Sequence, residues 1–202
     1  MGLLGAGGAS QAALVDAGNG LVNDTVLDIT WVAKAGLSGD QLSGTANWQD
    51  LVDWAEDLVY AGYDDWRLAS MSITSPTDSV FDCSGGSEQD CINSGNELGY
   101  MFNYSIVGSF PKTGDQIVGD VTLTGIQTVY WSGTEFASVP VGAWVFDPGD
   151  GLQDVVSKDV QFYGWAVRPG HVAAAPLPGT ALLMALGLGA IAGLRRARRR
   201  LW

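Results

Sequence analysis

The chain has 202 residues, of which 47% are hydrophobic and eight are tryptophan, so it can fill the core of one ordinary domain and is not disordered. Its formal net charge is -12, but five of its ten basic residues crowd into the last eight positions. Without that tail, 22 acidic residues face five basic ones, a net charge of -17. This charge all but excludes nucleic acid as a partner of the body and disfavours sulfated polysaccharides.

The N-terminal segment has the features of the end of a secretion signal. Residues 1–9 are apolar and small, and residues 9–12 (ASQA) place small residues as in a signal-peptidase site. Because no basic residue precedes them, we expect residues 1–12 to be the remnant of a signal peptide whose true start lies upstream. The mature body would then begin at Ala13.

Hydrophobic patterning predicts a strand hairpin and then a helix. Imperfect alternation of apolar and polar residues favours a hairpin over Leu21–Trp31. Over residues 47–61, apolar residues recur at helical spacing and acidic residues occupy the opposite face. Asn47 is the expected N-cap and Gly62 the expected C-terminal cap. The acidic face is most simply a solvated surface.

Cys83 and Cys91 bracket a Gly/Ser/Asp-rich spacer whose length and flexibility can let the two sulfurs meet. In an exported protein this pattern predicts a disulfide, and in the cytosol it predicts two free thiols. After this loop, Ser94 and Glu97 have the spacing of a capping box, which predicts a second, short helix through residues 100–104.

The last part of the body is predicted to be strands. Residues 142–146 and 152–156 read as two strands around a turn, and residues 160–167 as a closing strand. Because the helices interrupt the strands rather than alternate with them, the expected fold class is α+β. We expect one compact domain over residues 13–170, built of antiparallel strands with one long and one short helix.

Few residues are available for catalysis or for a cofactor. The single histidine, His171, falls in residues 171–176, an expected solvated linker, so neither a zinc site nor a His-assisted nucleophile is expected. Around the last turn, Asp147, Asp150 and Asp154 match no calcium motif closely. We therefore expect no cofactor beyond weak calcium association.

The C-terminal segment has three parts. Pro176–Gly179 (PLPG) precedes an apolar run from Thr180 to Leu194, which as a helix spans about 22 Å and is short for a bilayer core of about 30 Å. Basic residues after the run would hold its end on the cytoplasmic side and leave the body outside the cytoplasm. These residues are Arg195, Arg196, Arg198, Arg199 and Arg200.

Residues 177–202, with the proline that precedes them, resemble the PEP-CTERM sorting signal in its VPLP form. The sorting motif is carried by Pro176, Leu177, Pro178 and Gly179. The resemblance implies that an exosortase processes a precursor held at the periplasmic face of the inner membrane and releases the body to the cell envelope or extracellular matrix. A transmembrane anchor that is never cleaved is the alternative.

Three clusters in the body resemble the Lcl C-terminal domain family, formerly DUF1566. They are residues 62–68 (GYDDWRL), residues 130–135 (YWSGTE), and residues 143–146 (AWVF) with the later Lys158 and Arg168. The resemblance covers residues 21–170. This chain departs from the usual pattern at Ala69, where proline is usual, and at Gly133, where serine is usual. We expect both departures to lie in loops.

The resemblance implies an α+β fold akin to C-type-lectin-like and formylglycine-generating-enzyme-like domains. It also implies a bacterial surface protein, since the family includes an adhesin that binds polysaccharide. No catalytic residues carry over. Aromatic faces and guanidinium groups suit hydroxylated ligands, so the motif residues are a possible ligand site. The alternative is that the arginines anchor loops through carboxylate pairs and the tryptophans fill the core. The motif residues are Trp66, Arg67, Trp131, Glu135 and Arg168.

Two functions therefore stay open. The first is an exported, non-enzymatic binding or adhesion module for exopolysaccharide in the envelope or a biofilm. The second is a secreted hydrolase of polysaccharide, since glycoside hydrolysis needs only two carboxylates, for which Asp64, Asp65 and Glu135 are candidates.

Overall fold

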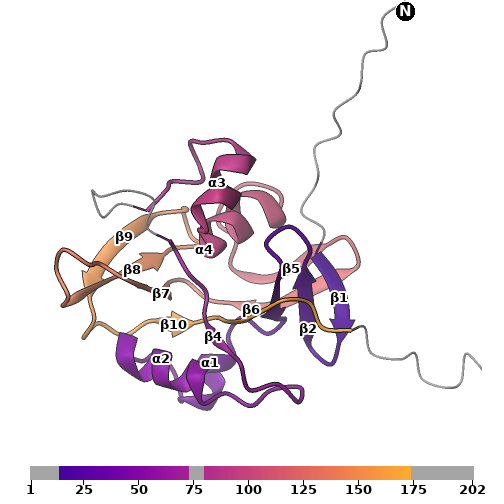
Figure 1. The fold of residues 1–202 in the computed structure, drawn as a ribbon, viewed down its shortest axis with the longest axis horizontal. Coiled ribbons are helices and arrows are strands. Elements are labelled where there is room, and N and C mark those ends of the chain that lie inside the picture. Colours follow the sequence, from indigo (N-terminus) through magenta and orange to yellow (C-terminus); the bar gives the residue numbers. More distant parts are fainter. Residues whose placement is uncertain (1–13, 73–79, 174–202) are drawn as a thin grey trace, which may run out of the picture.

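The structure is a computed structural model that describes residues 14–72 and 80–173. Its larger sheet has five strands, all antiparallel, in the order β1-β2-β3-β11-β4 (Figure 1). The predicted hairpin over residues 21–31 is confirmed as β2 and β3, and β1 is a strand that the pattern did not predict. The strands are β1 (Leu14–Gly18), β2 (Leu21–Asp24), β3 (Ile29–Val32), β4 (Arg67–Leu68) and β11 (Ala166–Pro169).

A second sheet has the order β10-β7-β8-β9, with β10 parallel to β7 and the other pairs antiparallel. The predicted strands at 142–146 and 152–156 are confirmed as β8 and β9. The sheet strands are β7 (Tyr130–Glu135), β8 (Gly142–Phe146), β9 (Gln153–Ser157) and β10 (Tyr163–Gly164), and a separate hairpin is formed by β5 (Gly114–Val118) and β6 (Val121–Ile126).

The single closing strand predicted over residues 160–167 is wrong. The chain leaves the second sheet after β10 and joins the first sheet in β11, so Trp165 lies between two strands of different sheets. Its side chain is 1% exposed, and its indole Nε1 donates a hydrogen bond to the carbonyl of Val32 at 2.7 Å. Burial of this large side chain fixes the point at which the chain changes sheets.

The long predicted helix is confirmed as α2 (Trp48–Glu56), but it is shorter than expected. The Asn47 cap is confirmed, because its side chain accepts a hydrogen bond from the backbone N–H of Asp50 at 3.0 Å. The predicted C-terminal cap at Gly62 is wrong. Beyond the helix, Tyr60 and Tyr63 exchange backbone hydrogen bonds of 3.0 Å across a tight reversal. A short helix, α1 (Leu37–Gln41), precedes α2.

The short predicted helix is also present, with a different cap. It consists of α4 (Glu97–Tyr100), continued by a π-helical turn, η1 (Met101–Ser105). The N-cap is Asn96, which accepts from the N–H of Gly99 at 2.8 Å, whereas the hydroxyl of the predicted cap Ser94 donates to the carbonyl of Cys91. A further helix, α3 (Glu88–Ser94), precedes it, so the described residues hold more helices than the one long and one short helix predicted.

Two hydrophobic clusters lie on opposite faces of the larger sheet. Trp31 and Val167 face one cluster, which also contains Phe102 of η1. Val32 and Leu68 face the other cluster, which is covered by α2. In Figure 1, α1 and α2 lie along one side of the strands and α3 and α4 along the other. The α+β prediction is therefore confirmed at the level of a mostly antiparallel domain with a few helices.

The end of the described chain is held on the domain. Val172 is 6% exposed, and it exchanges two hydrogen bonds with the side chain of Asn23, at 2.9 and 3.0 Å. The Nε2 atom of His171 lies 3.0 Å from the carbonyl oxygen of Asp24. The expected solvated linker therefore does not begin at His171, because residues 171 and 172 are tied to β2.

Within residues 14–72 and 80–173, no helix is long and apolar enough to cross a membrane. The predicted signal remnant, the sorting motif Pro176–Gly179 and the arginine cluster all fall outside the described residues.

Candidate functional site

The two motif tryptophans are core residues. Trp66 is 3% exposed and Trp131 is fully buried. Their indole N–H groups donate to the carbonyls of Tyr63 at 3.1 Å and of Val160 at 3.3 Å. Neither ring can therefore offer a face for stacking against a sugar, which agrees with the core alternative rather than the stacking one.

The two motif arginines point to opposite faces of the larger sheet. Arg67 lies opposite Val167 in the register of β4 and β11, so the next residue, Arg168, faces the other side. Arg168 forms two hydrogen bonds with Asp65, of 2.6 and 2.8 Å, and its guanidinium lies 4.2 Å from the ring centroid of Tyr63. This guanidinium lowers the pKa of Asp65. The five motif side chains consequently do not form one site.

A small cavity does lie beside Arg67, and we name it the Arg67 pocket. It has a volume of about 230 Å³ and opens beside β4, the last strand of the larger sheet, between residues of α2 and β7. Its lining is largely apolar, with a charged group at two points. The lining residues are Trp48, Val52, Glu56, Arg67, Leu68, Ser70 and Gly133.

Glu97 of α4 holds the guanidinium of Arg67 in a fixed orientation. The Nη2 and Nη1 atoms of Arg67 donate to the two carboxylate oxygens of Glu97 at 2.6 and 2.8 Å. The same carboxylate accepts the backbone N–H of Ser70 at 2.7 Å. The side chain of Glu97 is 9% exposed and that of Arg67 is 41% exposed, so the pair has one buried and one open side. The hydrogen bonds that Arg67 donates to Glu97 raise the pKa of the guanidinium, so it stays charged.

Glu135, the fifth motif residue, lies close to this pocket. Its carboxylate forms an ion pair with Lys158 at 2.9 Å. The ammonium of Lys158 lies 4.0 Å from the ring centroid of Trp48, a residue of the pocket lining. Arg67 and Glu135, which belong to different sequence clusters, are thus brought to the same region of the surface, whereas Arg168 is not.

Sequence reasoning missed three residues of this region. Trp48 and Glu56 were assigned only to the amphipathic helix, and Glu97 only to a helix cap. The only sequence signal for Glu97 was its place in a capping box followed by apolar residues. This signal does not predict that Arg67 is its partner.

Of the two departures from the family pattern, Ala69 lies outside the strands, as expected, whereas Gly133 does not lie in a loop. Gly133 lies within β7, and a Cβ atom there would be 3.2 Å from the carbonyl oxygen of Leu68. Ala69 is fully buried directly after β4, and its N–H donates to the carbonyl of Trp165 at 3.0 Å. Proline at position 69 would lack this donor. Gly133 lines the Arg67 pocket, and Ala69 directly follows Leu68, another residue of its lining.

A comparison with protein-family models matches residues 20–168 to the Lcl C-terminal domain. The chain belongs to the Lcl C-terminal domain family. The matched residues include the Arg67 pocket and its partner Glu97. Searches among curated proteins and among solved structures found no significant match.

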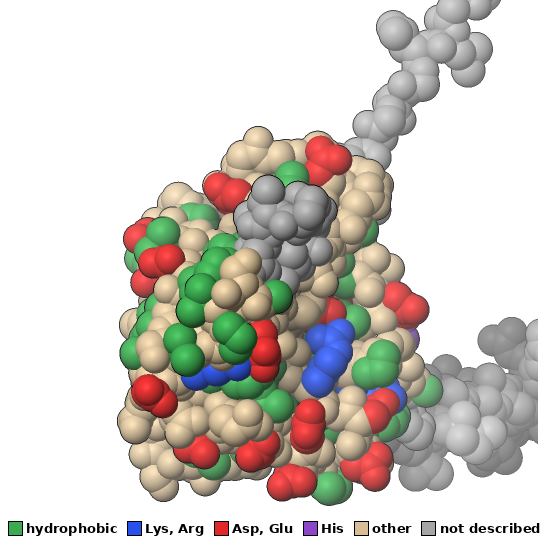
Figure 2. Space-filling model, turned by 60° about the vertical axis from the view of Figure 1, so that its left-hand side comes forward, with side chains coloured by type: hydrophobic (Ala, Val, Ile, Leu, Met, Phe, Trp, Pro, Cys, Tyr) green, Lys and Arg blue, Asp and Glu red, His purple; other side chains and the backbone are tan. Residues whose placement is uncertain are grey.

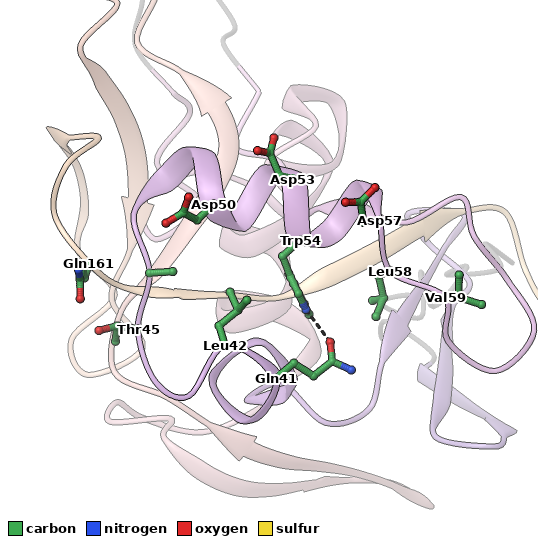
Figure 3. A pocket seen from close by; sticks show the side chains of 11 residues that line it. Gln41, Leu42, Thr45, Asp50, Asp53, Trp54, Asp57, Leu58, Val59 and Gln161 are labelled. Atoms are coloured by element: carbon green, nitrogen blue, oxygen red, sulfur yellow. Dashed lines mark hydrogen bonds between the residues drawn. The ribbon is translucent and has the colours of Figure 1, made fainter.

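Another hollow of this Lcl C-terminal domain lies along α2 (Figure 3) and has a volume of about 650 Å³. Asp50, Asp53 and Asp57 project from the helix along one rim. The floor includes Trp54, whose indole N–H donates to Gln41 at 2.6 Å. The three carboxylates are exposed to solvent, as expected for the acidic face of this helix.

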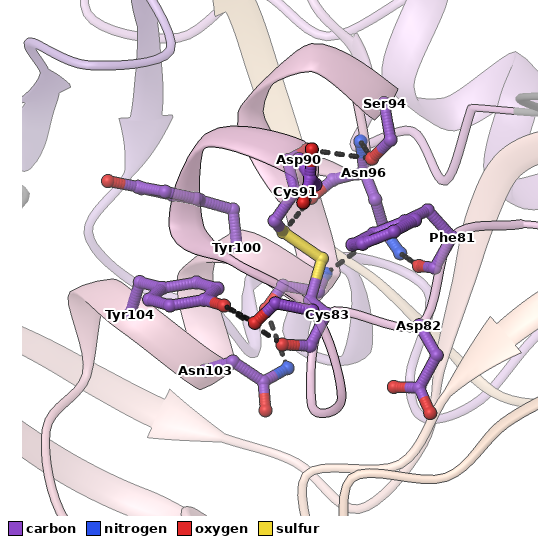
Figure 4. Close-up of a disulfide and its surroundings, with 12 residues drawn as sticks. Phe81, Asp82, Cys83, Asp90, Cys91, Ser94, Asn96, Tyr100, Asn103 and Tyr104 are labelled. Atoms are coloured by element: carbon purple, nitrogen blue, oxygen red, sulfur yellow. Dashed lines mark hydrogen bonds between the residues drawn. A yellow bond between two sulfur atoms is a disulfide. The ribbon is translucent and has the colours of Figure 1, made fainter.

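The predicted disulfide between Cys83 and Cys91 is confirmed, with a Cα–Cα distance of 5.2 Å (Figure 4). Both cysteines are buried and pack against Tyr100 of α4. The hydroxyl of Tyr104 donates to the carbonyl of Cys83 at 3.2 Å. The bridge therefore ties the loop before α3 to that helix and packs against α4, which carries Glu97.

The three aspartates considered for calcium each accept a nearby backbone N–H group. Asp147 accepts from Gly149, and Asp150 accepts from Leu152. Asp154 accepts the N–H of the next residue. Within the described parts of the chain, no group of three or more His, Cys, Asp or Glu side chains could hold a metal ion. Asp147 and Asp150 thus shape the turn between β8 and β9, whereas Asp154 lies within β9.

The five basic residues of the domain are all in contact with polar or acidic groups. Lys34 pairs with Asp40, and three others form the acidic pairs described above. The ammonium of Lys112 donates to the carbonyls of Phe102 and Ile106 at the end of η1. In Figure 2 the basic side chains are isolated blue patches among acidic and apolar ones, so this face has no continuous basic surface.

Proposed function

We propose that this Lcl C-terminal domain is a non-enzymatic binding module that engages polysaccharide of the cell envelope or extracellular matrix. The observation that carries the proposal is the Arg67 pocket. It combines an apolar floor with a guanidinium that Glu97 holds in place, and one side of that guanidinium stays open. Ligand sites for hydroxylated molecules combine such apolar surface with a few oriented polar groups.

We also propose that the protein is exported and sorted at its C-terminus. The disulfide supports export, because such bonds persist in oxidising compartments. The motif Pro176–Gly179 and the arginine cluster support an exosortase as the processing enzyme. The precursor would be anchored in the inner membrane by the apolar run, and the processed domain would reach the envelope or matrix.

The hydrolase alternative has weaker support. Of its candidate carboxylates, Asp65 is bound to Arg168 and has a lowered pKa, the opposite of what a general acid needs. Glu135 is paired with Lys158. Asp65 and Glu135 are thus both paired with basic side chains, which suits a structural role better than bond cleavage.

Binding of the oxidised full chain, in mild detergent, to a panel of immobilised neutral and acidic bacterial polysaccharides tests the proposal. We expect saturable binding to at least one of them, without release of new reducing ends. Arg67→Lys removes the planar fork and should weaken binding about tenfold, since hydrogen bonds to a charged group contribute roughly 1.5–3 kcal/mol.

Arg168→Lys is the matched control, because it breaks a similar two-bond pair on the opposite face. It should leave binding unchanged. The proposed function is wrong if no polysaccharide binds, or if reducing ends accumulate during the incubation.

A further inference from the structure

We propose that the Arg67 pocket binds one neutral pyranose residue of a polysaccharide, through two adjacent hydroxyl groups. This inference rests on the proposed function and specifies the class of sugar.

The hydrogen bonds of Arg67 leave one edge of its guanidinium for a ligand. A guanidinium carries five N–H groups in a fixed plane. Two of them bind Glu97, and a third donates to the carbonyl of Leu68 at 3.1 Å. Within residues 14–72 and 80–173, no acceptor binds the Nε–H or the second Nη2–H, which lie on the same edge of the group. Two parallel donors of this kind match two neighbouring oxygen acceptors.

The pocket has the size and surface for a single sugar ring. Its volume of about 230 Å³ is below the roughly 300–1,000 Å³ of sites for drug-sized ligands, which favours one ring over an oligosaccharide. Val52 is half-buried and offers apolar surface to the C–H groups of the ring, while Trp48 and Leu68, 6% and 3% exposed, close the wall of the pocket. The exposed carboxylate of Glu56 can accept a hydroxyl proton, while Arg67 donates to hydroxyl oxygens. Hydroxyl groups use both functions, because they donate and accept.

The charges around the pocket favour a neutral sugar over a uronic acid. Arg67 and Lys158 face three carboxylates, those of Glu56, Glu97 and Glu135. The body as a whole carries 22 acidic residues against five basic ones. A ligand carboxylate would approach this negative field and would meet a guanidinium that is already neutralised.

Side-chain NMR of the ¹⁵N-labelled full chain in detergent can observe the proposed contacts directly. The probes are the methyl pyranosides of glucose, galactose and mannose, with methyl glucuronide as the acidic comparison. We expect at least one neutral glycoside to shift the Arg67 Nε–H and Trp48 indole signals saturably. The Nε–H of Arg168, which donates to Asp65, is the internal reference and should stay in place.

Two variants test the site without breaking the Arg67–Glu97 pair. Val52→Phe places a larger side chain in the pocket and should weaken the glycoside affinity at least tenfold. Val59→Phe is its control, because Val59 is 73% exposed and lines the separate hollow along α2. Glu56→Gln lies on the exposed face of α2, so the fold should tolerate it, and it should weaken binding about fivefold by removing a charged acceptor.

The possible results separate this inference from the proposed function. If a polysaccharide binds but Val52→Phe and Glu56→Gln both bind as wild type does, the Arg67 pocket is not the site, and the binding function stands. If the glucuronide binds more tightly than every neutral glycoside, the sugar class is wrong. If neither polysaccharide nor glycoside binds the wild-type chain, both proposals are overturned.

Discussion

Arg67 and Glu97 are 30 residues apart in the sequence, yet two hydrogen bonds of 2.6 and 2.8 Å join them. Arg67 belongs to an edge strand of two residues and Glu97 to the first turn of a short helix. Because the Glu97 carboxylate also accepts the N–H of Ser70, it holds β4 against α4 while it orients the guanidinium. One pair therefore serves both the fold and the pocket.

Glu97→Gln should destabilise the domain by about 2 kcal/mol, because it leaves a half-buried guanidinium without its counter-charge. The partial exposure of Arg67 keeps this cost below that of a fully buried pair. Urea denaturation measures the effect. Asp40→Asn is the control, since it breaks the exposed pair with Lys34 and should cost at most about 1 kcal/mol. Equal effects of the two substitutions would contradict the structural role of Glu97.

Asp24 should make stability depend on pH in an unusual direction. Burial raises its pKa above the ordinary value of 3.8. As the pH rises above 3.8, the carboxyl group ionises first in the unfolded chain, so the native state loses stability until the folded pKa has been passed. Relative to wild type, Asp24→Asn should thus become more stable as the pH rises through this window. Denaturation between pH 3 and pH 8, on the order of one pH unit per step, measures the difference.

Asp65 should show the opposite dependence. Arg168 lowers its pKa, so the ionised group contributes stability above pH 3.8, and this contribution is lost as the pH falls through the folded pKa. Asp65→Asn should therefore lose stability relative to wild type at neutral pH and match it in acid. The same denaturation series measures this change. Parallel pH profiles for the two asparagine variants would show that at least one of the two assignments is wrong.

Removal of the disulfide should destabilise the domain and disturb α3 and its packing against α4, which carries Glu97. For a loop with a sequence separation of eight between the cysteines, the expected cost of Cys83→Ala with Cys91→Ala is about 2–3 kcal/mol. Thermal unfolding of the oxidised wild type and of the double variant measures it. In protein recovered from the periplasm, thiol alkylation should label neither cysteine of the wild type, and labelling of both would mean that no bridge forms in the cell.

Replacement of Pro176 and Pro178 by Ala should block processing of the tail. Prolines hold the chain extended and stop a helix at the membrane boundary, so their loss would let residues 173–175 continue the helix outward and hide the site. Intact-mass measurement should find a shortened wild-type chain and a full-length, membrane-associated variant. A wild-type chain that still ends at Trp202 in a strain with a functional exosortase would leave only the membrane-anchor alternative.

Part of the candidate site was predictable from local patterns. The motif clusters indicated Arg67 and Glu135 as candidate ligand residues, and these two residues do lie near one pocket. The same clusters also suggested Trp66 and Trp131, which are buried, and Arg168, which faces the other side of the sheet. A motif identifies residues that matter to a family, but it does not separate those that fill the core from those that face a ligand.

The sequence by itself determined the features that depend on neighbours within a few residues. These are the amphipathic helix with its Asn47 cap, the hairpin of β2 and β3, the strands β8 and β9, and a spacer that lets Cys83 and Cys91 meet. Only the tertiary structure decided that Trp165 lies where the chain changes sheets, that Glu97 pairs with Arg67, and that Asp65 binds Arg168. The last two contacts join residues 30 and 103 positions apart. They form because strand pairing and burial bring distant segments together, and no local periodicity encodes which segments will meet.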